Sequence, residues 1–189
     1  GARIVGKPHK YWVYPWKNYF YILTDEGAPE KRLFRTPYDK IERDNWEEVI
    51  PAREGVVLDD FEIVGNRLVV TLLEKAANQV EIRELDGTFV RNIEMPQLGE
   101  ISGMAGEPDE PELFYGYSSF AIPPKIFKTS IDNKKTETWA EIKLPVDPSK
   151  FVVRQVEYDS KDGTKVSMFL VYPSDTYLNG QTPFILYGY

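Results

Sequence analysis

The single histidine of the chain, His9, is the first candidate for chemistry, because an imidazole is the usual base that activates a serine nucleophile. A hydrolytic triad needs a nucleophile, that base, and a carboxylate that orients the base. His9 follows Lys7 and Pro8 in a polar opening segment, and no serine near it lies on a strand-to-helix turn. An exposed or lightly packed residue is therefore the better interpretation of His9.

One serine has a sequence context that resembles the turn on which hydrolases place their nucleophile. The segment reads Gly116-Tyr117-Ser118-Ser119-Phe120. The G-x-S-x-G pattern requires glycine where Phe120 stands, and no helical periodicity follows. These residues are therefore expected to form a strand and its turn.

The acidic run at residues 107–112 carries the carboxylate oxygens that calcium accepts. It lacks the glycine turn and the regular spacing of a calcium loop, and its two prolines favour a solvated connection between strands. The sequence also contains no Cys or His metal cluster and no phosphate-binding glycine loop. No metal and no cofactor is predicted.

Aromatic residues are dense near the start of the chain, at Trp12, Trp16, Tyr19 and Tyr21. They could stack on a ligand, but aromatic side chains are also common in the packing between strands. Packing is the preferred interpretation.

Short stretches of β-branched and aromatic residues, separated by turn residues, predict a chain of short strands from Tyr11 onward. Gly65-Asn66 and Asp86-Gly87 are typical of hairpin turns, and residues 132–135 predict another turn. Residues 39–48 have poor helical spacing and are expected to form a loop. The expected strands fall into three sets: 19–24, 31–36 and 46–50; 56–64, 67–73, 79–85 and 88–94; and, beginning near 101, 112–118, 126–130 and 137–143.

The three sets repeat, and each ends in a β run that is closed by proline. The prolines are Pro51, Pro96 and Pro145, at intervals of 45 (51 to 96) and 49 (96 to 145) residues. A period of about 40 to 50 residues with four short strands is typical of β-propeller blades. Proline suits the end of an outer strand because it lacks the N–H donor of the ladder. A β-sandwich with accidental spacing is the alternative.

Three blades cannot close a ring, because each blade buries its faces against a neighbour on both sides. The blade interpretation therefore predicts further polypeptide before this segment. The end of the chain leads to a similar expectation, since an apolar last strand with nothing to cover it is an unusual place for a domain to end.

The last segment predicts two paired strands and a third that follows them. Residues 152–158 and 165–172 flank Asp162-Gly163, which favours a two-residue hairpin turn. The second strand is apolar on both faces, as in a strand that is covered on both sides. Asn179-Gly180 predicts another tight turn, and residues 183–189 an apolar strand.

These residues resemble the start of the catalytic domain of the prolyl oligopeptidase family of serine peptidases. The resemblance rests on three runs: Ser160-Lys161-Asp162-Gly163-Thr164-Lys165-Val166, Met168-Phe169 and Leu186-Tyr187-Gly188-Tyr189. It extends more weakly over most of the remaining chain. It implies the C-terminal part of a seven-bladed β-propeller at residues 1–148, about three blades, and the first strands of an α/β-hydrolase domain at residues 149–189.

The resemblance also implies a role for Tyr189. In this family the second tyrosine of the Leu-Tyr-Gly-Tyr run supplies its phenol hydroxyl to the oxyanion hole, and that position matches Tyr189. Tyr187 would then pack or line the site. The triad and the proline pocket are expected beyond Tyr189, so this chain alone is expected to be inactive.

By the same resemblance the whole enzyme hydrolyses short proline-containing peptides on the carboxyl side of proline. The propeller limits access to the site, and the enzyme needs no metal or cofactor. Besides these peptide substrates, the chain would contact the remainder of its own polypeptide. A cytoplasmic location is implied, with the periplasm as the alternative. A related oligopeptidase that prefers basic residues and a non-enzymatic propeller interaction module are the other hypotheses.

Composition is compatible with this interpretation. With 42% hydrophobic and 14% aromatic residues the 189-residue chain can form a substantial core. A net charge of −7 argues against nucleic acid or an anionic membrane as partner, and no apolar run is long enough to span a bilayer. The absence of cysteine excludes a disulfide framework.

Overall fold

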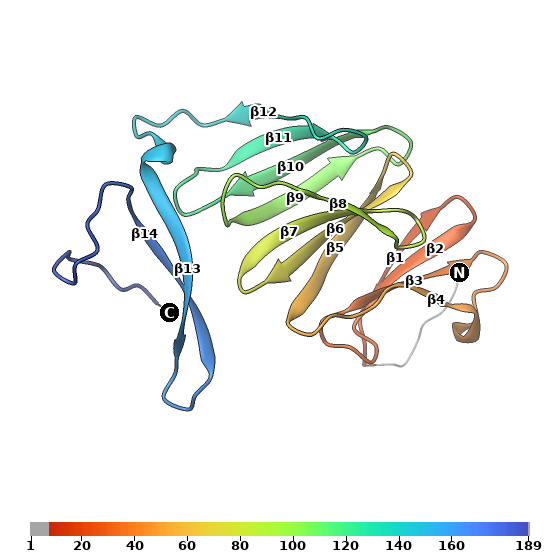
Figure 1. Cartoon of the computed structure of the whole chain (residues 1–189). Coiled ribbons are helices and arrows are strands. Elements are labelled where there is room, and N and C mark those ends of the chain that lie inside the picture. The colour runs from red at the N-terminus through yellow and green to blue at the C-terminus, as the bar shows by residue number, and fades with distance from the viewer. Residues whose placement is uncertain (1–7, 189) are drawn as a thin grey trace.

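Three four-stranded antiparallel sheets follow one another along the chain, and a two-stranded hairpin comes after them (Figure 1). The computed structural model describes residues 8–188. Blade 1 contains β1 (Tyr11–Trp16), β2 (Tyr19–Thr24), β3 (Arg32–Pro37) and β4 (Glu47–Ile50). Blade 2 contains β5 (Val56–Val64), β6 (Arg67–Glu74), β7 (Ala77–Arg83) and β8 (Phe89–Ile93). Blade 3 contains β9 (Glu100–Gly106), β10 (Glu112–Ser118), β11 (Lys125–Ser130) and β12 (Thr136–Glu141). The hairpin is formed by β13 (Phe151–Asp159) and β14 (Lys165–Pro173).

The expected strands of the blades and the hairpin are confirmed to within two residues at each end. The structure adds β1 and β9, for which the sequence analysis gave no bounds, and two short 3-10 turns, η1 (Arg43–Asn45) and η2 (Pro148–Lys150). Within each blade the strands pair in chain order, so each sheet is a meander. The proline prediction is confirmed as well, since β4, β8 and β12 are edge strands and are followed by Pro51, Pro96 and Pro145.

The strand predicted at residues 183–189 is wrong for residues 183–188, which form no ladder with another strand. Ile185 is 96% exposed and Leu186 86% exposed. A strand needs a partner for its N–H and C=O groups, and the apolar sequence alone does not supply one. Asn179 and Gly180 lie between β14 and this segment and form a bend, in which Gly180 has φ +80°.

The hairpin turns divide into two kinds. Gly65 and Asn66 form a two-residue turn with φ values of +53° and +61°, the type I′ geometry that suits the twist of the strands. The two-residue turn predicted at Asp162-Gly163 is wrong, because the loop spans residues 160–164. There the N–H of Thr164 donates to Asp162 Oδ1 at 3.0 Å, and Gly163 alone has positive φ.

The hydrophobic core lies between the blades, and β6 of blade 2 contributes to both interfaces. Leu68, Val70 and Leu72 pack toward Tyr21 and the other buried residues of blade 1. Val69 faces the opposite way and packs with the buried residues of blade 3. Alternate side chains of one strand therefore join three sheets, which is why this strand is apolar at nearly every position.

Blades 2 and 3 approach each other at their first strands. β5 lies against β9, whereas β12 is exposed at all six of its residues. Figure 1 shows the three sheets side by side, with the hairpin beyond blade 3. In the described part of the chain no helix is long and apolar enough to cross a membrane.

Replacing Gly87 with Ala tests how closely blades 1 and 2 pack. A Cβ at Gly87 would lie 1.7 Å from the carbonyl oxygen of Val49 in β4. Gly163 is the matched control, since its φ is also positive (+82°, against +90° for Gly87) but nothing lies within 4 Å of its Cβ position. We expect Gly163→Ala to lower the free energy of unfolding by about 1 kcal/mol. Gly87→Ala should lower it by at least about 2 kcal/mol more. Urea unfolding measures both, and equal losses would contradict the close contact.

Two tyrosines of β10 provide a second test, because both are buried but only one hydroxyl has partners. Tyr117 donates to the carbonyl of Gln97 at 2.8 Å and accepts from the N–H of Gln97 at 3.2 Å. The hydroxyl of Tyr115 has no hydrogen-bond partner, and burial raises its pKa to about 12. We expect Tyr117→Phe to cost about 1 to 2 kcal/mol and Tyr115→Phe to be neutral or stabilising, measured by urea unfolding. A larger loss for Tyr115→Phe would be the contrary result.

Candidate functional site

Tyr189, the residue to which the sequence assigns a catalytic role, lies outside the described residues. The described site is therefore the region that leads to it, namely the β13–β14 hairpin and the faces of the blades beside it. The other candidates from the sequence lie in the blades and can be placed directly.

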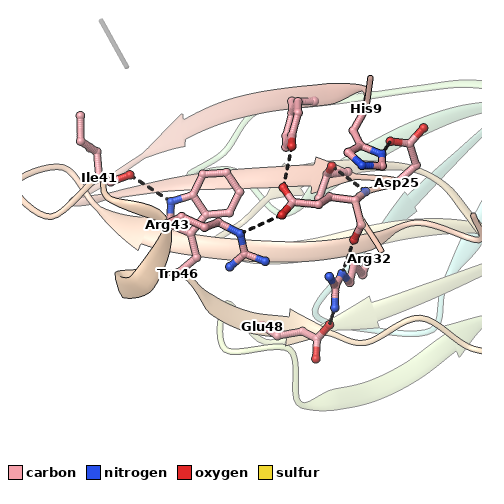
Figure 2. Close-up of polar contacts among 10 residues, drawn as sticks. His9, Asp25, Arg32, Ile41, Arg43, Trp46 and Glu48 are labelled. Atoms are coloured by element: carbon pink, nitrogen blue, oxygen red, sulfur yellow. Dashed lines mark hydrogen bonds and ion pairs between the residues drawn. The ribbon is translucent and has the colours of Figure 1, made fainter. Parts of the chain in front are cut away.

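His9 lies at the entrance to blade 1 and pairs with Asp25, with 3.4 Å between its Nδ1 and Asp25 Oδ1 (Figure 2). The same carboxylate oxygen accepts the N–H of Lys10 at 2.9 Å. Among residues 8–188 no serine hydroxyl hydrogen-bonds to the ring of His9. The arrangement thus has an imidazole and a carboxylate but no nucleophile. Its contacts connect the start of β1 to the turn after β2.

The early aromatics have packing roles. Tyr21 is 1% exposed, and its hydroxyl donates to the carbonyl of Leu85 in blade 2 at 3.3 Å. Trp16 and Tyr19 pack against the same core. Trp12 is more exposed, and the ammonium of Lys31 lies 5.0 Å from the centre of its ring. The packing interpretation is therefore confirmed for Trp16, Tyr19 and Tyr21.

The loop between β3 and β4 folds back over the face of blade 1 that points away from blade 2. The guanidinium of Arg43 lies over the rings of Phe34 and Trp46, at 4.6 and 4.9 Å from their centres. Arg43, labelled in Figure 2, also pairs with Glu26. Glu26 in turn accepts a hydrogen bond from the hydroxyl of Tyr11. Burial, reinforced by Glu26, raises the pKa of Tyr11 to about 12. The loop therefore buries this face with cation–π and aromatic contacts.

The acidic run is a connection between blades. The carbonyls of Glu107 and Pro108 accept the N–H groups of Gly65 and Asn66 at 3.1 and 2.6 Å, so the run joins blade 3 to the β5–β6 turn. Residues 8–188 contain no group of His, Asp and Glu side chains that could hold a metal ion.

The serine context at residues 116–120 is a strand and its turn, as predicted. Gly116, Tyr117 and Ser118 belong to β10, and no helix follows. The hydroxyl of Ser119 accepts the N–H groups of Ala121 and Ile122, which holds the turn, and Phe120 is left 67% exposed.

The hairpin meets the blades at two points. Lys75, in the turn between β6 and β7, pairs with Glu157 of β13 at 2.9 Å, and its carbonyl accepts the side-chain amide of Gln155. Phe120 contacts Phe169 of β14, with 5.1 Å between ring centres. Gln155 lies opposite Phe169 in the ladder, and Glu157 is two residues further along β13. These three side chains therefore project from one face of the hairpin.

The opposite face of the hairpin is mainly apolar, although the exposed Arg154 also projects from it. It carries Val152, Val156, Val166, Met168 and Leu170, all of intermediate exposure. Sequence analysis predicted apolar side chains on both faces of β14, but it missed the contacts of Lys75 and Phe120. Those residues are distant along the chain from their partners, and no local pattern marks them.

Comparisons with known proteins agree with this architecture. Residues 3–142 match the family described as "Prolyl oligopeptidase, N-terminal beta-propeller domain". The chain belongs to the prolyl oligopeptidase family. The prolyl endopeptidase of Elizabethkingia meningoseptica is 32% identical over 169 residues, which cover 89% of this chain and 24% of that protein. Prolyl oligopeptidase A of Amanita bisporigera is 28% identical over 174 residues, or 89% of this chain and 23% of that protein.

Solved structures of the family have the same fold. A prolyl endopeptidase studied for the role of inter-domain dynamics in catalysis and specificity has a TM-score of 0.81 and 40% identity, over 91% of this chain and 25% of that one. Prolyl oligopeptidase B from Galerina marginata has a TM-score of 0.79 at 22% identity, over 89% of this chain and 25% of that one. This chain therefore spans about a quarter of the length of these relatives.

Replacing His9 with Asn tests whether the pair that His9 forms with Asp25 has only a structural role. His9 and Asp25 are 35% and 30% exposed, so the pair is solvated and contributes roughly 1 kcal/mol or less. We expect a change of that size in the free energy of unfolding, measured in urea. In an active longer form of the protein, kcat should be unchanged. A fall in kcat of about 100-fold or more would identify His9 as a catalytic base instead.

Proposed function

We propose that the chain comprises the last three blades of a seven-bladed propeller, at residues 1–148, and the first strands of an α/β-hydrolase domain, at residues 149–189. The main support for this proposal is the position at which the match to the propeller family ends. It stops at residue 142, next to the end of β12 at Glu141, and a separate hairpin follows. The change from blade to hairpin therefore coincides with the boundary of the propeller family.

The two faces of the hairpin support this division. The face with Gln155, Glu157 and Phe169 contacts the blades, while the Val, Leu and Met side chains of the other face keep part of their surface exposed. Covering the apolar area that these side chains still expose would contribute roughly 25 cal/mol per Å². The remainder of a hydrolase sheet and its helices would supply that cover.

The proposed reaction is hydrolysis of short peptides on the carboxyl side of proline, through a serine acyl-enzyme. Attack on the peptide carbonyl develops negative charge on its oxygen, and the hydroxyl of Tyr189 would donate a hydrogen bond to that oxygen. The serine, histidine and aspartate of the triad would follow Tyr189, so this chain alone would be inactive. The blades would act as a filter that limits access to small substrates.

The relatives favour the prolyl branch over an oligopeptidase that prefers basic residues, because two relatives that are each 32% identical to this chain are named prolyl endopeptidases. A non-enzymatic propeller module is the remaining alternative. The two classes differ in one property, whether a longer form of the protein cleaves peptides.

The test is hydrolysis of a proline-specific chromogenic peptide by this chain and by the longer polypeptide from the same source. We expect cleavage after proline by the longer form and none by this chain. Tyr189→Phe in the longer form should lower kcat roughly 100-fold with little change in KM, since the hydroxyl acts in the transition state. An inactive longer form would support the interaction module, and cleavage after lysine or arginine would support the other oligopeptidase branch.

A further inference from the structure

The segment between β14 and Tyr189 contains a dipeptide whose side chain can react with its own backbone, Asn179-Gly180. The chain has seven asparagines, and Asn179 is the only one that precedes a glycine. When the backbone nitrogen of the next residue attacks the carboxamide carbon of an asparagine, a five-membered succinimide forms and ammonia leaves. A side chain on that next residue hinders the closure, and glycine has none.

Solvent reaches this dipeptide in the structure. Asn179 and Gly180 are both exposed, and they form a bend that belongs to none of the sheets. Gly180 has φ +80°, and nothing lies within 4 Å of its Cβ position. Neither packing nor strand pairing therefore prevents the backbone from reaching the geometry that ring closure needs.

The carboxamide of Asn179 is already held beside the backbone that follows it. Its Oδ1 accepts the N–H of Gln181 at 3.0 Å. Attack on Cγ places negative charge on Oδ1, and a hydrogen-bond donor at that oxygen stabilises the charge as it develops. The N–H of Gly180, which must lose its proton, makes no hydrogen bond within residues 8–188. The electrophile is therefore polarised and the nucleophile is unprotected.

The two Asp-Gly turns have the same side-chain cap but differ in both reacting groups. Asp86 and Asp162 each accept the N–H of the threonine two residues further on, at 2.9 and 3.0 Å. These bonds lower the pKa of both carboxyl groups, so each stays an ionised carboxylate, which is a poor electrophile. The N–H groups of Gly87 and Gly163 donate to backbone carbonyls, both at 2.9 Å, and are thereby protected.

Asn133 provides the complementary comparison. It is exposed, and its Oδ1 accepts the N–H of Lys135 at 2.8 Å, so its cap matches that of Asn179. The residue that follows it is Lys134, whose side chain crowds the nitrogen that would attack. Asn179 therefore combines features that each of these matched turns has only in part.

We propose that Asn179 is a site of spontaneous deamidation. The nitrogen of Gly180 loses its proton to solvent and forms a bond to Cγ of Asn179, while the side-chain nitrogen takes up a proton and leaves as ammonia. Water then opens the succinimide at either carbonyl, so the products are aspartate and isoaspartate. The net reaction consumes one water and releases one ammonia, and no oxidant or cofactor takes part.

Both products change the segment that leads to Tyr189. Each adds a negative charge, and isoaspartate also adds one carbon atom to the backbone at residue 179. The consequence for activity rests on the proposed function: if the hydroxyl of Tyr189 acts in the oxyanion hole, a displacement of about 1 Å would lower kcat roughly 100-fold. The modification itself does not depend on that function.

The test is storage of the longer, natively folded polypeptide at neutral and at alkaline pH, followed by peptide mapping with mass spectrometry. We expect the peptide that contains Asn179 to change from amide to acid and to separate into aspartate and isoaspartate forms. The rate should rise about tenfold for each pH unit, because the deprotonated fraction of the Gly180 nitrogen does so. The peptides with Asn133, Asp86 and Asp162 should stay unchanged over the same period.

Two variants make the test specific. Asn179→Gln should abolish the change, because glutamine would have to close a six-membered ring. Lys134→Gly should make Asn133 reactive, because it places a glycine after an asparagine that already has the same cap. Circular dichroism checks that each variant is folded before storage.

An unchanged amide at Asn179, equal deamidation of Asn133 in the parent, or the same change in Asn179→Gln would each overturn the proposal. The readout is a mass, so an inactive longer form would count against the peptidase assignment and not against the modification. In an active longer form, kcat should fall during storage in proportion to the modified fraction, and Asn179→Gln should retain its kcat. Deamidation without a loss of kcat would contradict the consequence for Tyr189.

Discussion

The burial of both faces of blade 2 is the constraint on which the rest of the structure depends. A twisted four-stranded sheet has two faces, and one sheet alone cannot keep both from water. Each face of blade 2 is covered by a neighbouring blade: Leu68 and Val70 pack toward blade 1, and Val69 packs toward blade 3. Each fully buried aliphatic side chain contributes about 1.5 to 3 kcal/mol, so the two interfaces outweigh any single polar contact between blades.

Polar clamps then fix how the blades are oriented. Arg91 of β8 donates to the carbonyls of Ser130, at the end of β11, and of Ile131 and Asn133 in the turn that follows. Burial, together with the neighbouring Arg67, lowers the pKa of Arg91, but a guanidinium stays charged at neutral pH. The carbonyl partners therefore compensate the partial desolvation of this charge. Between blades 1 and 2 the carbonyl of Leu85 accepts from Arg35, at 3.0 Å, as well as from Tyr21.

The blades were predictable from the sequence because their rules are local. Alternation, turn glycines and a closing proline specify strands and a repeat, and these features need no knowledge of distant residues. The predicted strand at 183–189 failed for residues 183–188 because pairing depends on a partner, which composition does not reveal. The two-residue turn at Asp162-Gly163 failed for a related reason, since a side chain that caps its own loop stabilises a longer turn as well. The role of Tyr189 was inferred from resemblance, and it stays a prediction.

The contrast between the blade interfaces and the hairpin contacts explains why the position of the candidate site is a separate problem from the fold. Blade packing is set by rows of buried side chains and does not change without unfolding. The hairpin depends on one exposed ion pair, one amide contact to a carbonyl and one pair of partly exposed rings. These contacts involve partly exposed groups, so they contribute less to stability than the buried rows between the blades. The local patterns that predict the blades therefore do not predict where the hairpin lies beside them.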